Sequence, residues 1–213
     1  ITSVFANQRS QRQSLGLQGG TASQAFSLKA HEYEENKHFL LGQYFRNNYK
    51  KTLEQLPIVK SAVQILRMEV WVTNRNGTTT DTRDVVGLMD LGEGNPFSGP
   101  PGNVNALPYN DVNGLYTTVK GLGRNTSQIQ NLLTGIGFRP VQDFEKTFAR
   151  KLTYGSEYVY NRQVGYISLN QQLQPDEVLA VAYQYTYNGR VYQVGEFSTD
   201  VPPDTTGNTQ NVL

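Results

Sequence analysis

The first patterned stretch of the chain places apolar residues three and four positions apart over residues 27–56. Its members are Tyr33, Phe39, Leu40, Tyr44, Phe45, Tyr49, Leu53 and Leu56. This spacing puts the side chains on one side of an α-helix. Pro57 ends the pattern, because proline has no backbone N–H to donate within a helix. We therefore predict one long helix with a broad aromatic face that ends before Pro57.

Between residues 66 and 73, mainly apolar residues occupy every second position, as in a strand with one buried face. One face of the predicted strand holds Leu66, Met68, Val70 and Val72, and the other holds Arg67, Glu69, Trp71 and Thr73. The sequence Asn74-Arg-Asn-Gly77 has the residues of a turn, and 82–89 has the pattern of a returning strand. We expect these two strands to pair as a hairpin.

Residues 92–114 are rich in Gly, Pro and Asn and are too long and polar for an ordinary tight connection. They are either a functional loop or a tether between subdomains. Because the segment offers little apolar area to offset the entropy of ordering, we expect it to be the most mobile region and the first to be cleaved by a protease.

Two helices are predicted after this loop. Thr126 and Ser127 can cap a short helix that runs through Leu133. Pro140 suits the first turn of a second helix that runs to Leu152. The two helices are expected to pack together.

Strand patterns fill the last third of the chain, at 164–169, 178–187 and 190–197. The dipeptide Asn188-Gly189 predicts a two-residue hairpin turn between the last two. With that turn, Tyr187 faces Arg190, Tyr185 faces Tyr192, Tyr183 faces Val194 and Val181 faces Glu196.

One face of this hairpin carries the larger side chains, which are Leu179, Val181, Tyr183 and Tyr185. We expect this face to pack on helices, with burial decreasing towards Tyr187 at the turn. The ideal register would place the Glu196 carboxylate in that core, where an unpaired charge is costly. A bulge at Gly195 is therefore expected to turn Glu196 to solvent.

Together these elements predict an α+β fold, with an antiparallel sheet, helices packed on one face and a long Gly/Pro/Asn-rich loop. Residues 1–22 are expected to be an extended or disordered lead-in and 202–213 a disordered tail. Residues 23–201 then form a single α+β domain, with a possible subdomain break near 92–114. The first residues lack an initiator Met and a signal sequence, so we expect an internal fragment of a longer protein.

Composition narrows the possible partners. The chain has 213 residues, 19 basic and 18 acidic side chains and a net charge of +1. The charges are scattered, so no basic stripe suits a phosphate backbone and nucleic acid is not an expected partner. No Cys is present, which excludes disulfides and thiolate zinc sites. No apolar run reaches the roughly 18 residues of a membrane-spanning helix.

Candidate catalytic and metal-binding groups have simpler explanations. His31, Glu35 and His38 share a face of the predicted first helix, but three residues spread over two turns do not converge on one ion. Asp143 with Glu145 is explained by capping of the second predicted helix, and Asp176 with Glu177 by solvation. We therefore expect no metal, no cofactor and no catalysis.

Aromatic residues offer a candidate binding surface. Stacked rings on a sheet can bind sugars, and the residues proposed for such a surface are Trp71, Tyr185, Tyr187 and Tyr192, with Tyr183 nearby. Core packing of the same rings is the alternative explanation.

Several long stretches resemble the SprA/Sov family. They are Phe39-Leu-Leu-Gly-Gln-Tyr-Phe-Arg-Asn-Asn-Tyr49, Glu69-Val-Trp-Val-Thr-Asn74, Asp90-Leu-Gly-Glu93, 161–170 and 176–197. They occur in the same order as in that family and extend over roughly residues 36–200, which is more specific than a short motif.

The resemblance implies part of the outer-membrane translocon of the type IX secretion system of Bacteroidota, which also serves gliding motility. Its partners would be other secretion-system components and transiting cargo proteins. The fragment would be a soluble non-barrel domain on the extracellular or periplasmic side, with the extracellular side favoured. Its role would be structural, gating or partner docking, without catalysis. A cell-surface module that binds glycan or peptide is the alternative.

Overall fold

The computed structural model describes residues 27, 29–89, 91–93, 106–120, 122 and 125–201. The expected lead-in, the expected tail and most of the Gly/Pro/Asn-rich loop lie outside these residues. The chain divides into two units, Ile1–Tyr33 and Glu34–Leu213. In the first unit the described residues include a 3-10 helix, η1 (Ala30–Glu32), whose Glu32 carboxylate accepts a hydrogen bond from the Lys29 backbone at 2.9 Å.

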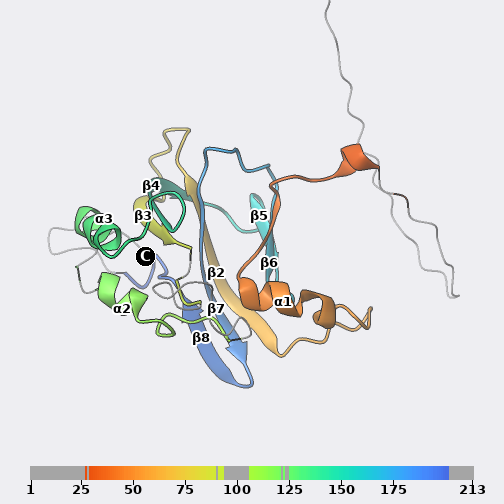
Figure 1. Cartoon of the computed structure of the whole chain (residues 1–213). Helices are drawn as coiled ribbons and strands as arrows, with labels where there is room; N and C mark the ends of the chain where they lie inside the picture. The colour runs from red at the N-terminus through yellow and green to blue at the C-terminus, as the bar shows by residue number, and fades with distance from the viewer. Residues whose placement is uncertain are drawn as a thin grey trace, which may run out of the picture. The chain divides into compact units, whose positions relative to one another are not determined.

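Two antiparallel sheets and three α-helices make up the described part of the second unit (Figure 1). The larger sheet has the order β3-β4-β2-β7-β8. Its strands are β2 (Val63–Thr73), β3 (Thr82–Leu88), β4 (Phe144–Lys151), β7 (Leu179–Tyr187) and β8 (Arg190–Val194). The smaller sheet, ordered β1-β6-β5, comprises β1 (His38–Leu40), β6 (Tyr166–Leu169) and β5 (Tyr158–Asn161). The predicted α+β class with antiparallel pairing is confirmed.

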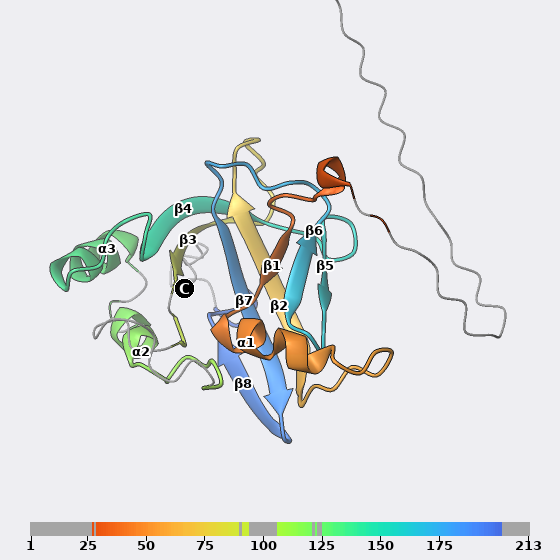
Figure 2. The same ribbon diagram turned by 45° about the vertical axis from the view of Figure 1, so that its right-hand side comes forward.

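The main core lies between the two sheets, as Figure 2 shows. The alternation of β2 directs Met68, Val70 and Val72 towards the smaller sheet, where Ile167 meets them. Helix α1 (Gln43–Thr52) adds Phe45 to the same core. The Phe45 ring packs edge-on against Tyr183 and Tyr185, with centroids 6.0 and 6.2 Å away.

Helices α2 (Leu115–Lys120) and α3 (Thr126–Gly135) cover β3 and β4. Their buried residues Leu115, Val119, Ile129 and Leu133 pack with Val86 and Phe144. The register of the larger sheet puts Val86 and Phe144 on the same face as Val72, so both clusters share one face of the curled sheet.

On the opposite face of the larger sheet, Trp71 lies among smaller side chains. Trp71 and Val85 pack there with Ala149 and Ala180, and Val201 covers them. A Cβ at Gly87 would lie 3.8 Å from the Cβ of Ala180, an ordinary van der Waals distance, so β3 and β7 approach each other at this point. Small residues let β3 curl towards β7 on this side.

The predicted helix over 27–56 is wrong in extent. Among the described residues of this range only Gln43–Thr52 is α-helical, and residues 38–40 form β1 instead. Phe39 pairs with Ile167 and points into the core, whereas His38 and Leu40 point outward, which is the alternation of a strand. Cross-strand pairing therefore overrides the helical spacing of the aromatic residues.

The two strands predicted to form a hairpin are not neighbours, because β4 lies between β2 and β3. The helix predicted over 140–152 is this strand β4. Pro140 precedes a turn in which the Asp143 carboxylate accepts the Arg139 N–H at 2.7 Å, so Asp143 caps no helix. A register shift between Ile65 and Arg67 leaves Leu66 exposed rather than on the buried face.

Other local predictions are confirmed. The helix after residue 125 forms, although its cap is Asn125, whose Oδ1 accepts hydrogen bonds from Ser127 and Gln128. The β7–β8 hairpin has the predicted register from Tyr187↔Arg190 to Tyr183↔Val194.

The prediction that Glu196 turns to solvent is wrong. Its side chain is buried, with 4% of its surface exposed.

Candidate functional site

Strand β8 pairs with only part of β7, from Tyr183 to Tyr187. The Thr73 N–H bonds to the Val178 carbonyl at 3.1 Å, so alternate residues from 178 onward direct their backbone groups to β2. Leu179 and Val181 then direct their N–H and C=O groups to the other edge. Within the described part of the chain, no backbone group bonds to this edge, which we call the open edge of β7.

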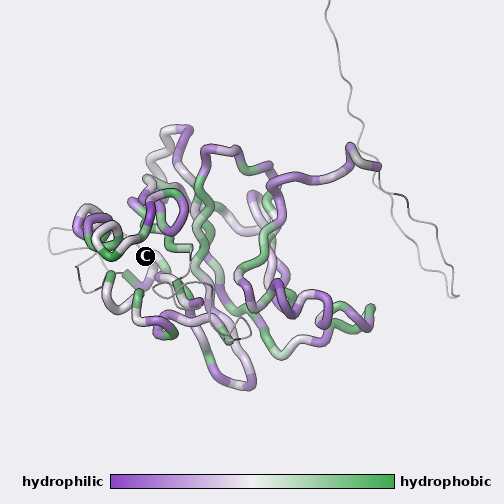
Figure 3. The backbone as a smooth tube through the Cα atoms, viewed as in Figure 1, coloured by the Kyte–Doolittle hydropathy of each residue, from purple (hydrophilic) through white to green (hydrophobic). Residues whose placement is uncertain are grey.

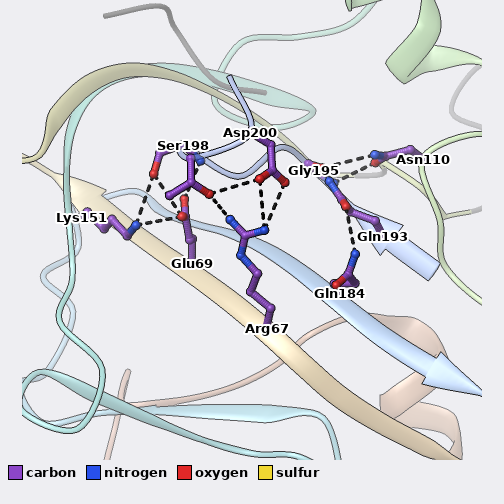
Figure 4. A network of polar contacts seen from close by, with 10 residues as sticks. Arg67, Glu69, Asn110, Lys151, Gln184, Gln193, Gly195, Ser198 and Asp200 are labelled. Carbon is purple, nitrogen blue, oxygen red and sulfur yellow. Dashed lines mark hydrogen bonds and ion pairs between the residues drawn. The ribbon is translucent and has the colours of Figure 1, made fainter. Parts of the chain in front are cut away.

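Asn110 explains why the pairing of β8 stops. Its Oδ1 accepts the Gly195 N–H at 2.8 Å and its Nδ2 donates to the Gly195 carbonyl at 3.2 Å. Gly195 has a φ of +75°, a conformation that favours glycine. As Figure 4 shows, Asn110 binds the chain at the end of β8. The chain therefore turns away after Val194 and leaves the first half of β7 uncovered.

A cleft of about 760 Å³ follows the open edge, with β3 and β7 among its walls. Its apolar lining includes Val85, Leu88, Leu91, Phe144, Leu179 and Val181. Its polar lining includes Trp71, Glu93, Glu145 and Glu196. The mixture of an apolar wall and a few polar groups is typical of binding sites.

Two buried polar atoms in this lining have no hydrogen-bond partner among the described residues. They are Nε1 of Trp71, a donor, and Oε2 of Glu145, an acceptor. Leaving such an atom unsatisfied costs about 1–3 kcal/mol. A cleft with one unsatisfied donor and one unsatisfied acceptor suits a ligand that carries both kinds of group.

The chain after Gly195 is fixed across the face of the sheet that carries Arg67, Glu69 and Trp71. The buried Glu69 carboxylate accepts hydrogen bonds from Lys151 Nζ at 2.8 Å and from the Ser198 N–H at 2.8 Å (Figure 4). Arg67 pairs with Asp200 at 3.1 Å, and its guanidinium lies 3.8 Å from the centre of the Phe197 ring. These contacts hold residues 197–200 in place, next to the cleft residue Glu196.

The aromatic residues proposed from the sequence do not form one exposed platform. Trp71 and Tyr185 are buried, with 3% and 0% of their surface exposed, and they lie on opposite faces of the sheet. Tyr185 donates to the Pro108 carbonyl at 2.7 Å, and burial raises its pKa well above the usual range. Tyr187 and Tyr192 are half-buried, and Tyr192 stacks on Tyr185 at 5.4 Å.

The histidine cluster predicted on one helix does not exist as a helix face. His31 lies in η1, whereas His38 lies in β1 and contacts Ser168 Oγ and Glu34, each at 2.8 Å. The hydrogen bond from His38 and the neighbouring Lys37 lower the pKa of Glu34. In the ranges that the structure describes, no group of three His, Asp or Glu residues is placed to hold a metal ion.

Asp176 and Glu177, proposed from the sequence as an acidic pair, each contact a different partner. Asp176 forms an ion pair with Arg75 at 2.8 Å, and Glu177 accepts the Gln174 N–H at 2.9 Å. Sequence reasoning missed Asn110, and it missed Glu145 as part of a cleft. No local pattern marks either residue, because each acts on a segment distant in sequence.

Among the described helices, none has the length and apolar character needed to cross a membrane. Residues 1–98 match a family model named SprA_N, described as a motility related/secretion protein. No curated protein matches the chain. The matched region includes β2 and β3, and so it contains Trp71 and the β3 wall of the cleft. The match over residues 1–98 supports a relationship of this chain to the SprA family of motility-related and secretion proteins.

Proposed function

We propose that this part of the chain is a docking domain of an outer-membrane translocon of the type IX secretion system of Bacteroidota. Its cleft would bind an extended segment of another secretion-system component or of a transiting cargo protein. The relationship to a motility and secretion family supports the setting. The open edge of β7 supports the docking role.

The open edge is the observation that carries this proposal. A peptide in β conformation presents an N–H and a C=O at every second residue, which matches the backbone groups of Leu179 and Val181. Adding a strand to a sheet edge is a common mode of peptide recognition. The Trp71 N–H and the Glu145 carboxylate would then bind polar groups of the same peptide.

We infer that the domain acts without catalysis and without a cofactor. Ser198 Oγ lies 3.2 Å from Lys151 Nζ, a contact that could suggest a nucleophile and its base. The Ser198 hydroxyl instead donates to Glu69 Oε1 at 3.0 Å, and Lys151 Nζ donates to the same carboxylate oxygen at 2.8 Å. The contact therefore serves to hold the segment around Ser198.

For the location, we propose that the domain lies outside the hydrocarbon layer, with the extracellular side favoured over the periplasm. This proposal follows from the family relationship and from a surface rich in uncharged polar residues, with only 17% charged residues in the chain. Accessibility of the domain to an added protease on intact cells tests it. Cleavage only after the outer membrane is opened would contradict the extracellular location.

Hydrogen exchange tests the docking role. Peptides of about ten residues, the length of a long strand, would be selected from a random phage-displayed library on the immobilised chain. In the free protein the amides of Leu179 and Val181 should exchange rapidly, and a bound peptide should protect them. The amides of Ala180 and Ala182 bond to β2 and serve as internal controls that are protected in both states.

Two substitutions localise the peptide. Trp71→Phe removes the unsatisfied donor, and it should weaken binding about fivefold to tenfold if the peptide uses that N–H. Tyr187→Ala, at the far end of the hairpin, should leave binding unchanged. Selected peptides that leave Leu179 and Val181 unprotected, but lose affinity in the Tyr187 variant, would instead support a surface module.

A further inference from the structure

The segment between α1 and β2, residues 53–60, presents apolar side chains to solvent. Leu56 and Ile58 expose 66% and 65% of their surface, and Tyr49 in the last turn of α1 is also exposed. In Figures 1 and 3 this segment projects beyond α1 and has hydrophobic residues at its end. We call residues 53–60 the tip segment.

Hydrogen bonds fix the shape of the tip segment. The Lys60 N–H bonds to the Thr52 carbonyl at 3.0 Å and closes the base of the loop. The Ile58 N–H bonds to the Gln55 carbonyl at 3.0 Å and forms a turn at its end. The exposed apolar side chains are therefore presented by a closed, hydrogen-bonded loop.

Basic side chains are concentrated in α1 and the tip segment. Residues 43–60 hold Arg46, Lys50, Lys51 and Lys60 against a single acidic residue, Glu54, and all five side chains are exposed. The chain as a whole has a net charge of only +1, so these cations are a local concentration. In the described part of the chain, none of the four pairs with a carboxylate.

We infer that the tip segment binds the surface of a lipid bilayer with anionic headgroups. Its apolar end is convex, so it suits insertion among headgroups, and the basic side chains suit the negative surface. Exposed apolar groups rimmed by charge mark interaction sites on soluble domains. This inference is independent of the proposed docking function, because residues 53–60 do not line the cleft.

Vesicle sedimentation tests the inference with the whole chain. The protein should bind vesicles that contain phosphatidylcholine and phosphatidylglycerol, and it should bind pure phosphatidylcholine vesicles weakly. The double variant Leu56→Asp with Ile58→Asp, and the double variant Lys50→Glu with Lys51→Glu, should each reduce the partition coefficient by about tenfold or more. High salt should weaken binding of the natural chain, because it screens the headgroup charge.

The β7–β8 hairpin provides matched controls, since Val191 and Arg190 are exposed apolar and basic residues there. The changes Val191→Asp and Arg190→Glu should leave vesicle binding unchanged. Thermal denaturation followed by circular dichroism would establish that every variant is folded. Absence of binding to anionic vesicles by the natural chain would overturn the inference, and so would equal losses in the tip and hairpin variants.

Discussion

Replacing Lys151 by Met should destabilise the fold through the carboxylate that it leaves behind. Glu69 is buried with 4% of its surface exposed, and Lys151 Nζ is its one cationic partner at 2.8 Å among the described residues. Met keeps most of the length and apolar character of the lysine stem. The substitution therefore removes the charge with little change in packing.

The expected loss can be worked out from the local contacts. Removing one partner of a buried ion pair costs about 3–5 kcal/mol when the other charge has no remaining partner. Glu69 retains two hydrogen bonds, from the Ser198 N–H and from Ser198 Oγ at 3.0 Å, and the Lys151 side chain is partly exposed. Both facts reduce the loss, so we expect a decrease of about 2 kcal/mol in the free energy of unfolding.

A double-mutant cycle in urea gives the measurement. The variant Lys151→Met with Glu69→Leu removes both charges and should recover at least half of the loss, because no buried carboxylate remains. A double variant that is less stable than Lys151→Met alone would refute the reasoning. It would show that the hydrogen bonds of Glu69 to Ser198 stabilise the fold more than the buried charge destabilises it.

The remaining predictions concern tyrosines. Tyr183→Ala should lower the free energy of unfolding by about 3 kcal/mol, since its ring is buried against Phe45, whereas Tyr187→Ala at the hairpin end should cost under about 1 kcal/mol in the same urea titration. Burial raises the pKa of Tyr158 to about 12 from 10.0. The stability contributed by its neutral form is therefore present below pH 10.0 and is lost as the pH rises from 10.0 to 12. The melting temperature should therefore fall less steeply over this range in Tyr158→Phe, and parallel curves would contradict the shift.

Features set by neighbouring residues were predictable from the sequence. The Asn188-Gly189 turn has positive φ at both residues, which suits the right-handed twist of the strands and fixes the register of β7 and β8. The helix after Asn125 has its local cap and apolar spacing. In both cases the deciding contacts lie within a few residues along the chain.

Contacts between residues far apart in the sequence determine the features that local sequence patterns did not predict. Residues 144–151 alternate poorly in polarity, and only their position between β2 and β3 makes them a strand. Glu196 is buried because its carboxylate accepts a hydrogen bond from Tyr116 in α2 at 3.0 Å, a helix that had no clear pattern. The cleft depends on Asn110 and Gly195, which are 85 positions apart. A contact between residues so far apart produces no periodic pattern in the sequence.

The central position of β2 has a consequence for the order of folding. Its two neighbours, β4 and β7, follow it in the sequence by many tens of residues, so β2 has no sheet partner until β4 has been made. Loop closure over such distances is slow, and an unpaired apolar strand is prone to aggregate. The sheet cannot be completed until the chain through Val194 is available. A chain in which β2 has formed early would therefore need a chaperone, or rapid completion of synthesis, to protect it.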